Sequence, residues 1–153
     1  MKKSLGKLNI ITSNPYYSVL SYNKNYNNLD NIFIGENTNG CGSGWTAKFI
    51  PNHFFSIKFC VSCTIHDLDY MLAKSRYWAD RRLKRNIEAI AKEYYRRIKK
   101  DLNIKWFQFW KWDDLLDAKI QKDFVLNIAK TYYKVVRKAG KSAWENGHKI
   151  KGK

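Results

Sequence analysis

Apolar residues recur at helical spacing through most of the chain. One run extends from Phe54 or Ser56 to about Lys74, and after a break near Ser75 a second covers about residues 77–102. Apolar side chains of the second run follow steps of three and four residues, which place them on one face of an α-helix: Leu83, Ile87, Ile90, Tyr94 and Ile98. The short break predicts that the two helices pack antiparallel.

A third helix is predicted further along the chain. Asp113 or Asp114 suits its N-cap, because an aspartate side chain accepts hydrogen bonds from the free backbone amides there, and the helix is expected to end near Gly140. Its expected buried face comprises Leu116, Ile120, Phe124, Ile128, Tyr132, Val135 and Val136.

An aromatic-rich connector, residues 104–112, precedes this third helix. It holds five large rings beside Lys105 and Lys111: Trp106, Phe107, Phe109, Trp110 and Trp112. We interpret these rings as packing between the second and third helices. Contact with a membrane interface and stacking on nucleic-acid bases are the alternatives.

The chain divides into three segments that differ in how strongly their sequences predict α-helix. Residues 1–38 predict an irregular N-terminal arm with at most a short hairpin. Residues 39–140 predict a helical domain, and residues 141–153 a basic C-terminal tail that frays. The length of 153 residues suits one compact domain. The expected fold is therefore mainly α, with two antiparallel helices, a third helix after them and an irregular arm before them.

The chain is strongly basic. Its formal net charge of +16 favours anionic partners: an anionic phospholipid membrane surface, nucleic acid or an acidic protein. No apolar run is long enough to span a membrane, and Met1–Ile11 lacks the apolar core and cleavage site of a secretory signal. We therefore expect neither a transmembrane segment nor a signal peptide. The oligomeric state stays open.

Residues 39–45, Asn-Gly-Cys-Gly-Ser-Gly-Trp, form the densest glycine cluster of the chain. Glycines at alternate positions, Gly40, Gly42 and Gly44, disfavour helix and strand but permit a loop whose backbone carbonyls turn inward. Calcium takes about six to eight oxygen ligands in proteins, many of them backbone carbonyls. The cluster is therefore a candidate calcium loop, provided that a carboxylate lies opposite it.

The segment from Cys63 to Tyr70, Cys-Thr-Ile-His-Asp-Leu-Asp-Tyr, carries candidate chemistry. Neighbours on a helix point roughly 100° apart, so His66 and Asp67 cannot pair but can face one cavity. His66 suits a general base that holds a water, and Asp67 suits an oxygen ligand to a hard cation. Tyr70, one turn after His66, can steady the polar network. Asp69 points away from Asp67 and is expected to face solvent.

A general-base histidine needs a partner on its other ring nitrogen, and Asp80 is the candidate. Asp80 falls at the start of the second helix, on its apolar face, where an acid demands a partner. Antiparallel packing of the first two helices brings His66 and Asp80 together across the interface between these helices. The alternative is that Asp80 merely stabilises the helix N-terminus.

Two of these patterns resemble motifs of the phospholipase A2 superfamily. Cys63-x-x-His66-Asp67-x-x-Tyr70 resembles the active-site helix of that family, and Cys41-Gly-Ser-Gly44 resembles its calcium loop. The resemblance implies calcium-dependent hydrolysis of the sn-2 ester of glycerophospholipids, with His66 as the catalytic base and Asp80 as the residue that orients it. It implies Ca²⁺ as cofactor, bound by the carbonyls of Gly40, Gly42 and Gly44 and by Asp67.

The resemblance also implies a disulfide between Cys41 and Cys63, which leaves Cys60 free. The Ala79-Asp80 pair looks closest to viral members, such as the phospholipase domain of parvovirus capsids. A phage or virion protein is therefore expected, made in the host cytoplasm and carried in a virion or released by a route without a signal.

The resemblance covers roughly residues 39–90, and the chain departs from the family pattern elsewhere. It has three cysteines, whereas secreted members are rich in disulfides, and its interval between the two helices is short. Two alternatives stay open. One is a non-catalytic protein of the same fold that serves as a structural, nucleic-acid-binding or virion-binding part. The other is a zinc protein with the ligands Cys41, Cys60, Cys63 and His66.

Overall fold

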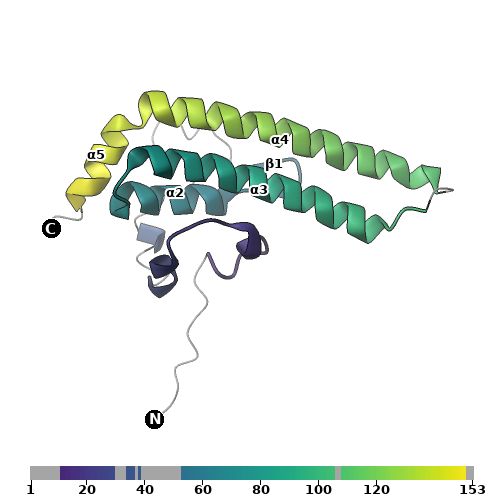
Figure 1. Cartoon of the computed structure of the whole chain (residues 1–153), viewed down its shortest axis with the longest axis horizontal. Helices are drawn as coiled ribbons and strands as arrows, with labels where there is room; N and C mark the ends of the chain where they lie inside the picture. Colours follow the sequence, from purple (N-terminus) through teal and green to yellow (C-terminus); the bar gives the residue numbers. More distant parts are fainter. Residues whose placement is uncertain (1–10, 30–33, 37, 39–52, 106–107, 151–153) are drawn as a thin grey trace, which may run out of the picture.

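The computed structural model describes residues 11–29, 34–36, 38, 53–105 and 108–150. The chain is mainly helical, which confirms the fold class predicted from the sequence. Figure 1 shows the elements, of which the η elements are short 3-10 helices: η1 Tyr17–Val19, η2 Lys24–Asn28, β1 His53–Phe54, β2 Ile57–Lys58, α2 Cys60–Leu72, α3 Arg76–Leu102, η4 Phe109–Lys111, α4 Trp112–Ala139 and α5 Lys141–Ile150.

Helices α3 and α4 form a long antiparallel hairpin, and α2 lies beside the first half of α3 and runs in the opposite direction (Figure 1). Only three residues, Ala73 to Ser75, connect α2 with α3, so the chain must reverse at once and the two helices pack as neighbours. The interface between these two helices, the α2–α3 seam, carries the candidate site. Among the described helices, none combines the length and apolar character needed to cross a membrane.

The core lies where α2, α3 and α4 meet. The expected apolar face of α3 is buried at Leu83, Ile87 and Ile90. Side chains from the N-terminal segment complete the core, because Ile11, Tyr26 and Ile34 are at most 2 % exposed. The described part of the N-terminal arm therefore packs on the helices rather than extending away from them. No hairpin forms in residues 11–29, where η1 and η2 are found instead.

The predicted start of the first helix is wrong. Residues 53–58 form a small antiparallel hairpin, in which His53 pairs with Lys58 and Phe54 with Ile57. Phe55 at its turn has a φ of 52°, a left-handed conformation that a helix cannot include. Helix α2 therefore begins at Cys60, after the fully buried Phe59.

The predicted buried face of the third helix is also wrong in its first half and at Val135, which is 36 % exposed. Leu116, Ile120 and Phe124 are 55 %, 56 % and 43 % exposed, whereas Ala118, Val125 and Ala129 are buried. Small side chains at the contact allow α4 to approach α3 closely, so the larger apolar residues turn outward. The N-cap is Lys111, and the first turn of the helix contains Asp113 and Asp114.

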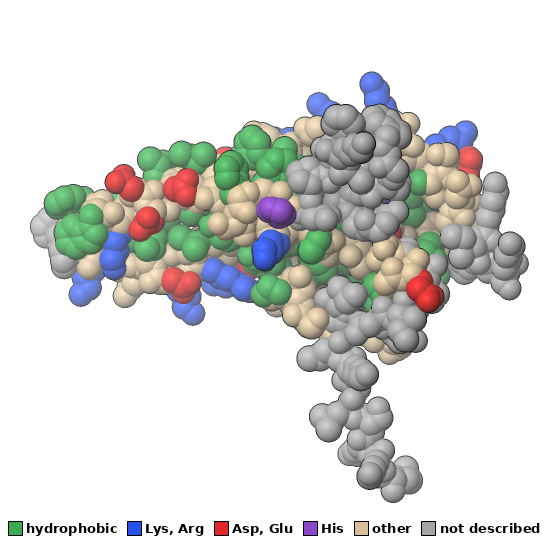
Figure 2. Space-filling view, turned by 180° about the vertical axis from the view of Figure 1, so that it is seen from behind, with side chains coloured by type: hydrophobic (Ala, Val, Ile, Leu, Met, Phe, Trp, Pro, Cys, Tyr) green, Lys and Arg blue, Asp and Glu red, His purple; other side chains and the backbone are tan. Residues whose placement is uncertain are grey.

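The described rings of the aromatic connector do not pack between α3 and α4, contrary to our interpretation. Phe109, Trp110 and Trp112 are 74 %, 59 % and 53 % exposed, while Trp106 and Phe107 lie outside the described residues. Figure 2 shows hydrophobic side chains gathered at the α3–α4 turn and along the neighbouring part of α4. Helix α2 lies beside the first half of α3, away from the α3–α4 turn, and so does not cover the three rings (Figure 1).

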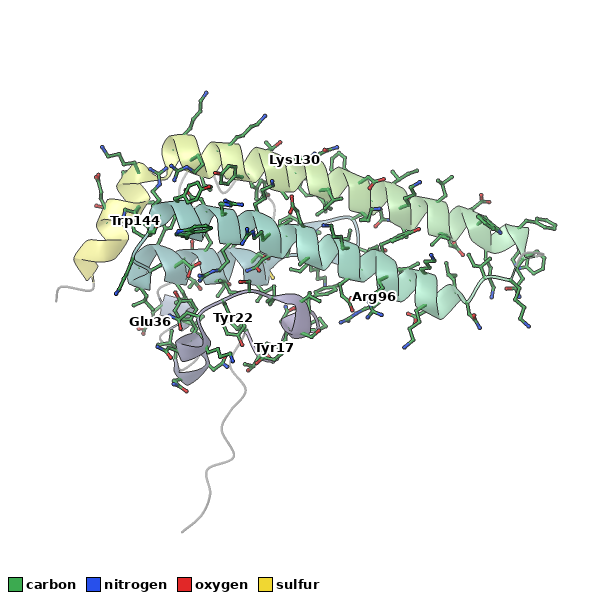
Figure 3. All side chains as sticks on the ribbon, in the orientation of Figure 1. Tyr17, Tyr22, Glu36, Arg96, Lys130 and Trp144 are labelled. Carbon is green, nitrogen blue, oxygen red and sulfur yellow. The ribbon has the colours of Figure 1, made fainter. Side chains whose placement is uncertain are left out.

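The C-terminal segment is not a frayed tail over its described length. Helix α5, which carries Trp144, folds back towards α2 (Figure 3). The Trp144 ring meets the Tyr70 ring edge-on, with centroids 5.4 Å apart. Gly147 is buried, and a Cβ there would lie 2.8 Å from the carbonyl oxygen of Tyr70. Packing against α2 thus stabilises α5, whose own sequence did not predict a helix.

Candidate functional site

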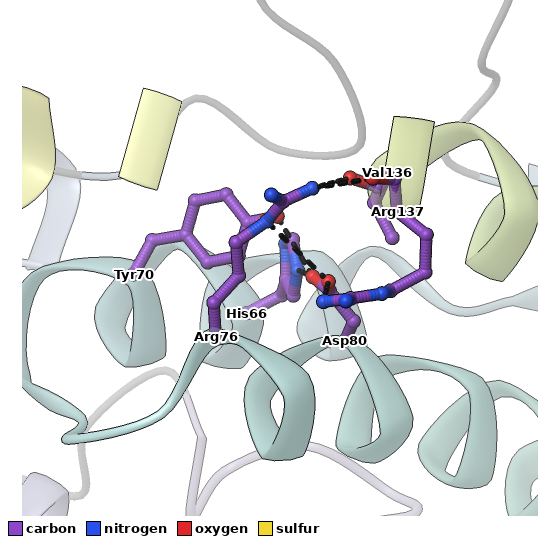
Figure 4. A network of polar contacts seen from close by, with 6 residues as sticks. All are labelled: His66, Tyr70, Arg76, Asp80, Val136 and Arg137. Atoms are coloured by element: carbon purple, nitrogen blue, oxygen red, sulfur yellow. Dashed lines mark hydrogen bonds and ion pairs between the residues drawn. The ribbon is translucent and has the colours of Figure 1, made fainter. Parts of the chain in front are cut away.

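His66 and Asp80 meet across the α2–α3 seam. Nε2 of His66 lies 3.0 Å from Oδ1 of Asp80, and the two side chains are 8 % and 0 % exposed (Figure 4). The antiparallel packing inferred from the sequence brings together these two residues, fourteen positions apart. Asp80 is therefore bound as a partner of His66 and does more than stabilise a helix N-terminus.

Three further groups hold the Asp80 carboxylate. The Tyr70 hydroxyl donates to Oδ1 at 2.7 Å, Nη1 of Arg137 donates to Oδ2 at 2.9 Å, and Nε of Arg76 lies 3.7 Å from Oδ2 (Figure 4). Burial acts to raise the pKa of Asp80, but the hydrogen bonds from His66, Tyr70 and Arg137 outweigh it, and the pKa is lowered. The group is thus a carboxylate at neutral pH.

This arrangement fixes the roles of the two imidazole nitrogens. A carboxylate accepts hydrogen bonds, so Nε2 of His66 carries the hydrogen that it directs to Asp80. Nδ1 is then the basic nitrogen, and it makes no hydrogen bond to a described residue. The ring of Tyr70 lies against the imidazole, with centroids 4.1 Å apart. His66 is thus held in one tautomer and one orientation.

Arg76 and Arg137 are site residues that the sequence reasoning missed. Nη2 of Arg76 donates to the carbonyl oxygens of Val136 and Arg137, both at 2.7 Å, and so ties the start of α3 to the end of α4 (Figure 4). The chain has 29 Lys and Arg residues, and nothing in their spacing marks Arg137. Arg76 is separated from Asp80 by one helical turn, a local pattern that could have indicated it.

Asp69 was expected to face solvent, and this is wrong. Its side chain is fully buried, and Oδ1 accepts hydrogen bonds from Tyr26 at 2.8 Å and from Nη1 of Arg82 at 2.7 Å. Burial raises the pKa of Asp69, against the opposing effect of Arg82 and Tyr26. Helix α2 is covered by α3 and by the N-terminal segment, so a side chain that points away from Asp67 still meets protein.

Asp67 is half-buried on α2, next to His66. Its carboxylate oxygens are the donor type that calcium prefers, so this part of the expected ligand set fits the metal. The other expected ligands, the carbonyls of Gly40, Gly42 and Gly44, lie outside the described residues. Within residues 11–29, 34–36, 38, 53–105 and 108–150, no cluster of three or more His, Cys, Asp or Glu side chains is placed to hold a metal.

Cys63 takes part in a disulfide, and Cys60 is a free, exposed cysteine. Cys41, the partner that the family resemblance implies, lies outside the described residues. A disulfide sulfur is not a thiolate and does not ligate zinc as one. The zinc set that requires Cys63 and His66 together therefore does not form in this structure.

The geometry suits proton transfer by a buried, oriented imidazole beside a carboxylate. No protein-family model matches this chain, and neither a curated protein nor a solved structure matches it. The likeness to phospholipases A2 therefore rests on the two sequence motifs, and the case for an activity rests on the residues of the α2–α3 seam.

Proposed function

We propose that this protein is a calcium-dependent phospholipase A2-like hydrolase that cleaves the sn-2 ester of glycerophospholipids. The observation that carries the proposal is the 3.0 Å contact between His66 Nε2 and Asp80 in a buried seam. Burying a paired histidine and aspartate carries a desolvation penalty that stability alone does not require, and a buried carboxylate with a shifted pKa, such as Asp80, is typical of functional sites.

His66 acts as the general base. Its Nδ1 accepts a proton from a water as the oxygen of that water attacks the ester carbonyl carbon, and the imidazole becomes an imidazolium. The same nitrogen returns the proton to the alkoxide oxygen of the departing lysophospholipid when the carbon–oxygen bond breaks. General-base catalysis contributes roughly 10²- to 10⁴-fold in rate.

Asp80 is a positioning residue in this scheme. Its carboxylate keeps the hydrogen on Nε2 and stabilises the positive charge that His66 acquires. Tyr70 and Arg137 hold the carboxylate in turn. Because three groups besides His66 bind Asp80, its orientation does not depend on the proton state of the imidazole.

Asp67 and the carbonyls of Gly40, Gly42 and Gly44 are the proposed ligands of Ca²⁺. When bound, the ion supplies a Lewis acid that polarises the ester carbonyl and stabilises the negative charge on its oxygen. The half-buried position of Asp67 beside the base supports this assignment. One carboxylate binds calcium weakly by itself, so the proposed site depends on the loop carbonyls as well.

Removal of calcium is expected to abolish hydrolysis. The purified protein should release fatty acid from the sn-2 position of phospholipid vesicles at millimolar calcium, and chelation should reduce the rate to background. Re-addition of calcium should restore it, while magnesium, which demands a stricter geometry, should not. Vesicles labelled separately at the sn-1 and sn-2 chains provide the readout by mass of the released acid.

Two results would count against this function. Release of both acyl chains at similar rates would indicate a different esterase. No release from either neutral or acidic vesicles at any calcium concentration would leave a protein with a His–Asp pair and no lipase activity, which is the non-catalytic alternative.

A further inference from the structure

A cationic groove runs along the α3–α4 hairpin beside the candidate site. Its volume is about 380 Å³, and it is lined from α3 and from α4 by Tyr77, Arg81, Lys84, Arg85, Glu88 and Tyr133. The volume falls at the small end of the range of small-molecule sites, roughly 300–1,000 Å³. A polar group of modest size therefore fits it.

The groove carries a positive excess. Three of its lining residues are cations and one is an acid, so their formal charges sum to +2. Lys84 forms an ion pair with Glu88, in which Nζ lies 3.5 Å from Oε1. Arg85 is exposed and makes no ion pair with a described residue. The cluster therefore favours binding of an anionic group.

One of the three cations, Arg81, is oriented by aromatic rings. Nη1 of Arg81 donates to the Tyr77 hydroxyl at 2.8 Å, and its guanidinium lies 5.5 Å from the Tyr77 centroid and 5.3 Å from that of Trp78. A guanidinium held in this way loses little freedom when it binds a phosphate, with which it forms two parallel hydrogen bonds. The Arg81 guanidinium is thus already oriented to bind an oxyanion in the groove.

Arg137 connects the groove to the candidate site. Its guanidinium lies 5.7 Å from the Tyr77 centroid, and its Nη1 donates to Asp80. Because Arg137 contacts both Tyr77 of the groove and Asp80 of the candidate site, a headgroup in the groove would lie close to His66. This is the arrangement expected of a site that binds one part of a substrate while another part reacts.

We infer that this groove binds the phosphate of an anionic phospholipid headgroup, an inference that rests on the proposed function for its choice of a lipid source. A groove of about 380 Å³ has room for one headgroup, whereas a nucleic-acid duplex contacts a wide surface, about 600–1,000 Å² even for a single DNA-binding module. The formal charge of +2 on the lining residues complements the negative charge of one phosphate group.

The test compares two double variants that lose the same charge from the same helix. Lys84→Gln/Arg85→Gln removes two cations of the groove, and Lys99→Gln/Lys100→Gln removes two exposed lysines at the far end of α3. The two pairs are separated by roughly 20 Å of helix, well beyond the screening length of about 8 Å at physiological salt. Thermal unfolding should show that both variants fold.

Binding is measured to phosphatidylcholine vesicles that contain phosphatidic acid, with calcium chelated so that hydrolysis plays no part. The groove variant should bind about 30-fold more weakly, since each surface cation contributes about 1 kcal/mol to binding an anionic membrane, and the control variant should lose less than about threefold. Failure of hydrolysis alone leaves this comparison intact, so the two proposals fail separately.

Three further probes identify the source of the phosphate. Pure phosphatidylcholine vesicles should bind weakly to all three proteins, and glycerol 3-phosphate should compete with the acidic vesicles for the wild type. Equal losses in the two variants would overturn the inference, as they would indicate non-specific charge. Tighter binding of a short DNA duplex than of acidic vesicles, lost in the groove variant, would overturn it in favour of nucleic acid.

Discussion

His66→Gln should lower the rate of calcium-dependent ester hydrolysis by about 10²- to 10⁴-fold. A glutamine amide can still donate a hydrogen bond towards Asp80, but it has no basic nitrogen to replace Nδ1. The imidazole is 8 % exposed and packs on Tyr70, so the smaller side chain should cost modest stability. The loss should appear in kcat, since the base acts on the reacting water and not on substrate binding.

His53→Gln is the matched control for this prediction. His53 is exposed in β1, so the same substitution there should leave hydrolysis unchanged. A His66→Gln protein that keeps more than about a tenth of the wild-type rate would contradict the role of His66 as the base.

Asp80→Asn should reduce the free energy of unfolding at neutral pH by about 2–3 kcal/mol. The change keeps the shape of the side chain but removes the charge that binds His66, Tyr70 and Arg137. We expect less than the full cost of a broken buried ion pair, because Arg137 and Arg76 are 38 % and 18 % exposed and water screens them in part. Urea unfolding provides the measurement, and Asp101→Asn, at an exposed position near the end of α3, is the control.

The stability lost in Asp80→Asn should depend on pH. The pKa of Asp80 in the folded protein is lowered below its ordinary value of 3.8. The carboxylate therefore contributes stability above that ordinary value, and this contribution is lost as the pH falls through the lowered folded value. The difference between wild type and Asp80→Asn should shrink once the pH falls below 3.8, as Asp80 takes up its proton. A difference that persists undiminished in strong acid would contradict the assigned charge state.

The α2–α3 seam could be predicted from the sequence because its signals are local. Helical periodicity defines α3, a short break reverses the chain, and Asp80 interrupts an otherwise apolar face. A buried acid must find a partner, and in an antiparallel pair the helix opposite offers His66. Each step depends on residues within one hairpin, where spacing determines which side chains can meet.

The remaining features of the fold depend on contacts between distant segments. One partner of Asp69, Tyr26, lies 43 residues earlier, and Arg137 reaches Asp80 from 57 residues later. Periodicity cannot choose one arginine among many or assign the face of α4, where Leu116 and Ala118 are both plausible contacts. The placement of α5 depends likewise on the surface that α2 presents to it, which its own sequence does not specify.

The most direct test of the central claim, a divalent cation held by Asp67 beside His66, is a calorimetric calcium titration of the wild type and of Asp67→Asn. We expect one calcium ion per chain for the wild type and a loss of affinity of at least about tenfold for the variant, since Asp67 is the sole charged ligand proposed and calcium affinity follows ligand charge. Absence of calcium binding in the wild type, or equal binding by the two proteins, would contradict it.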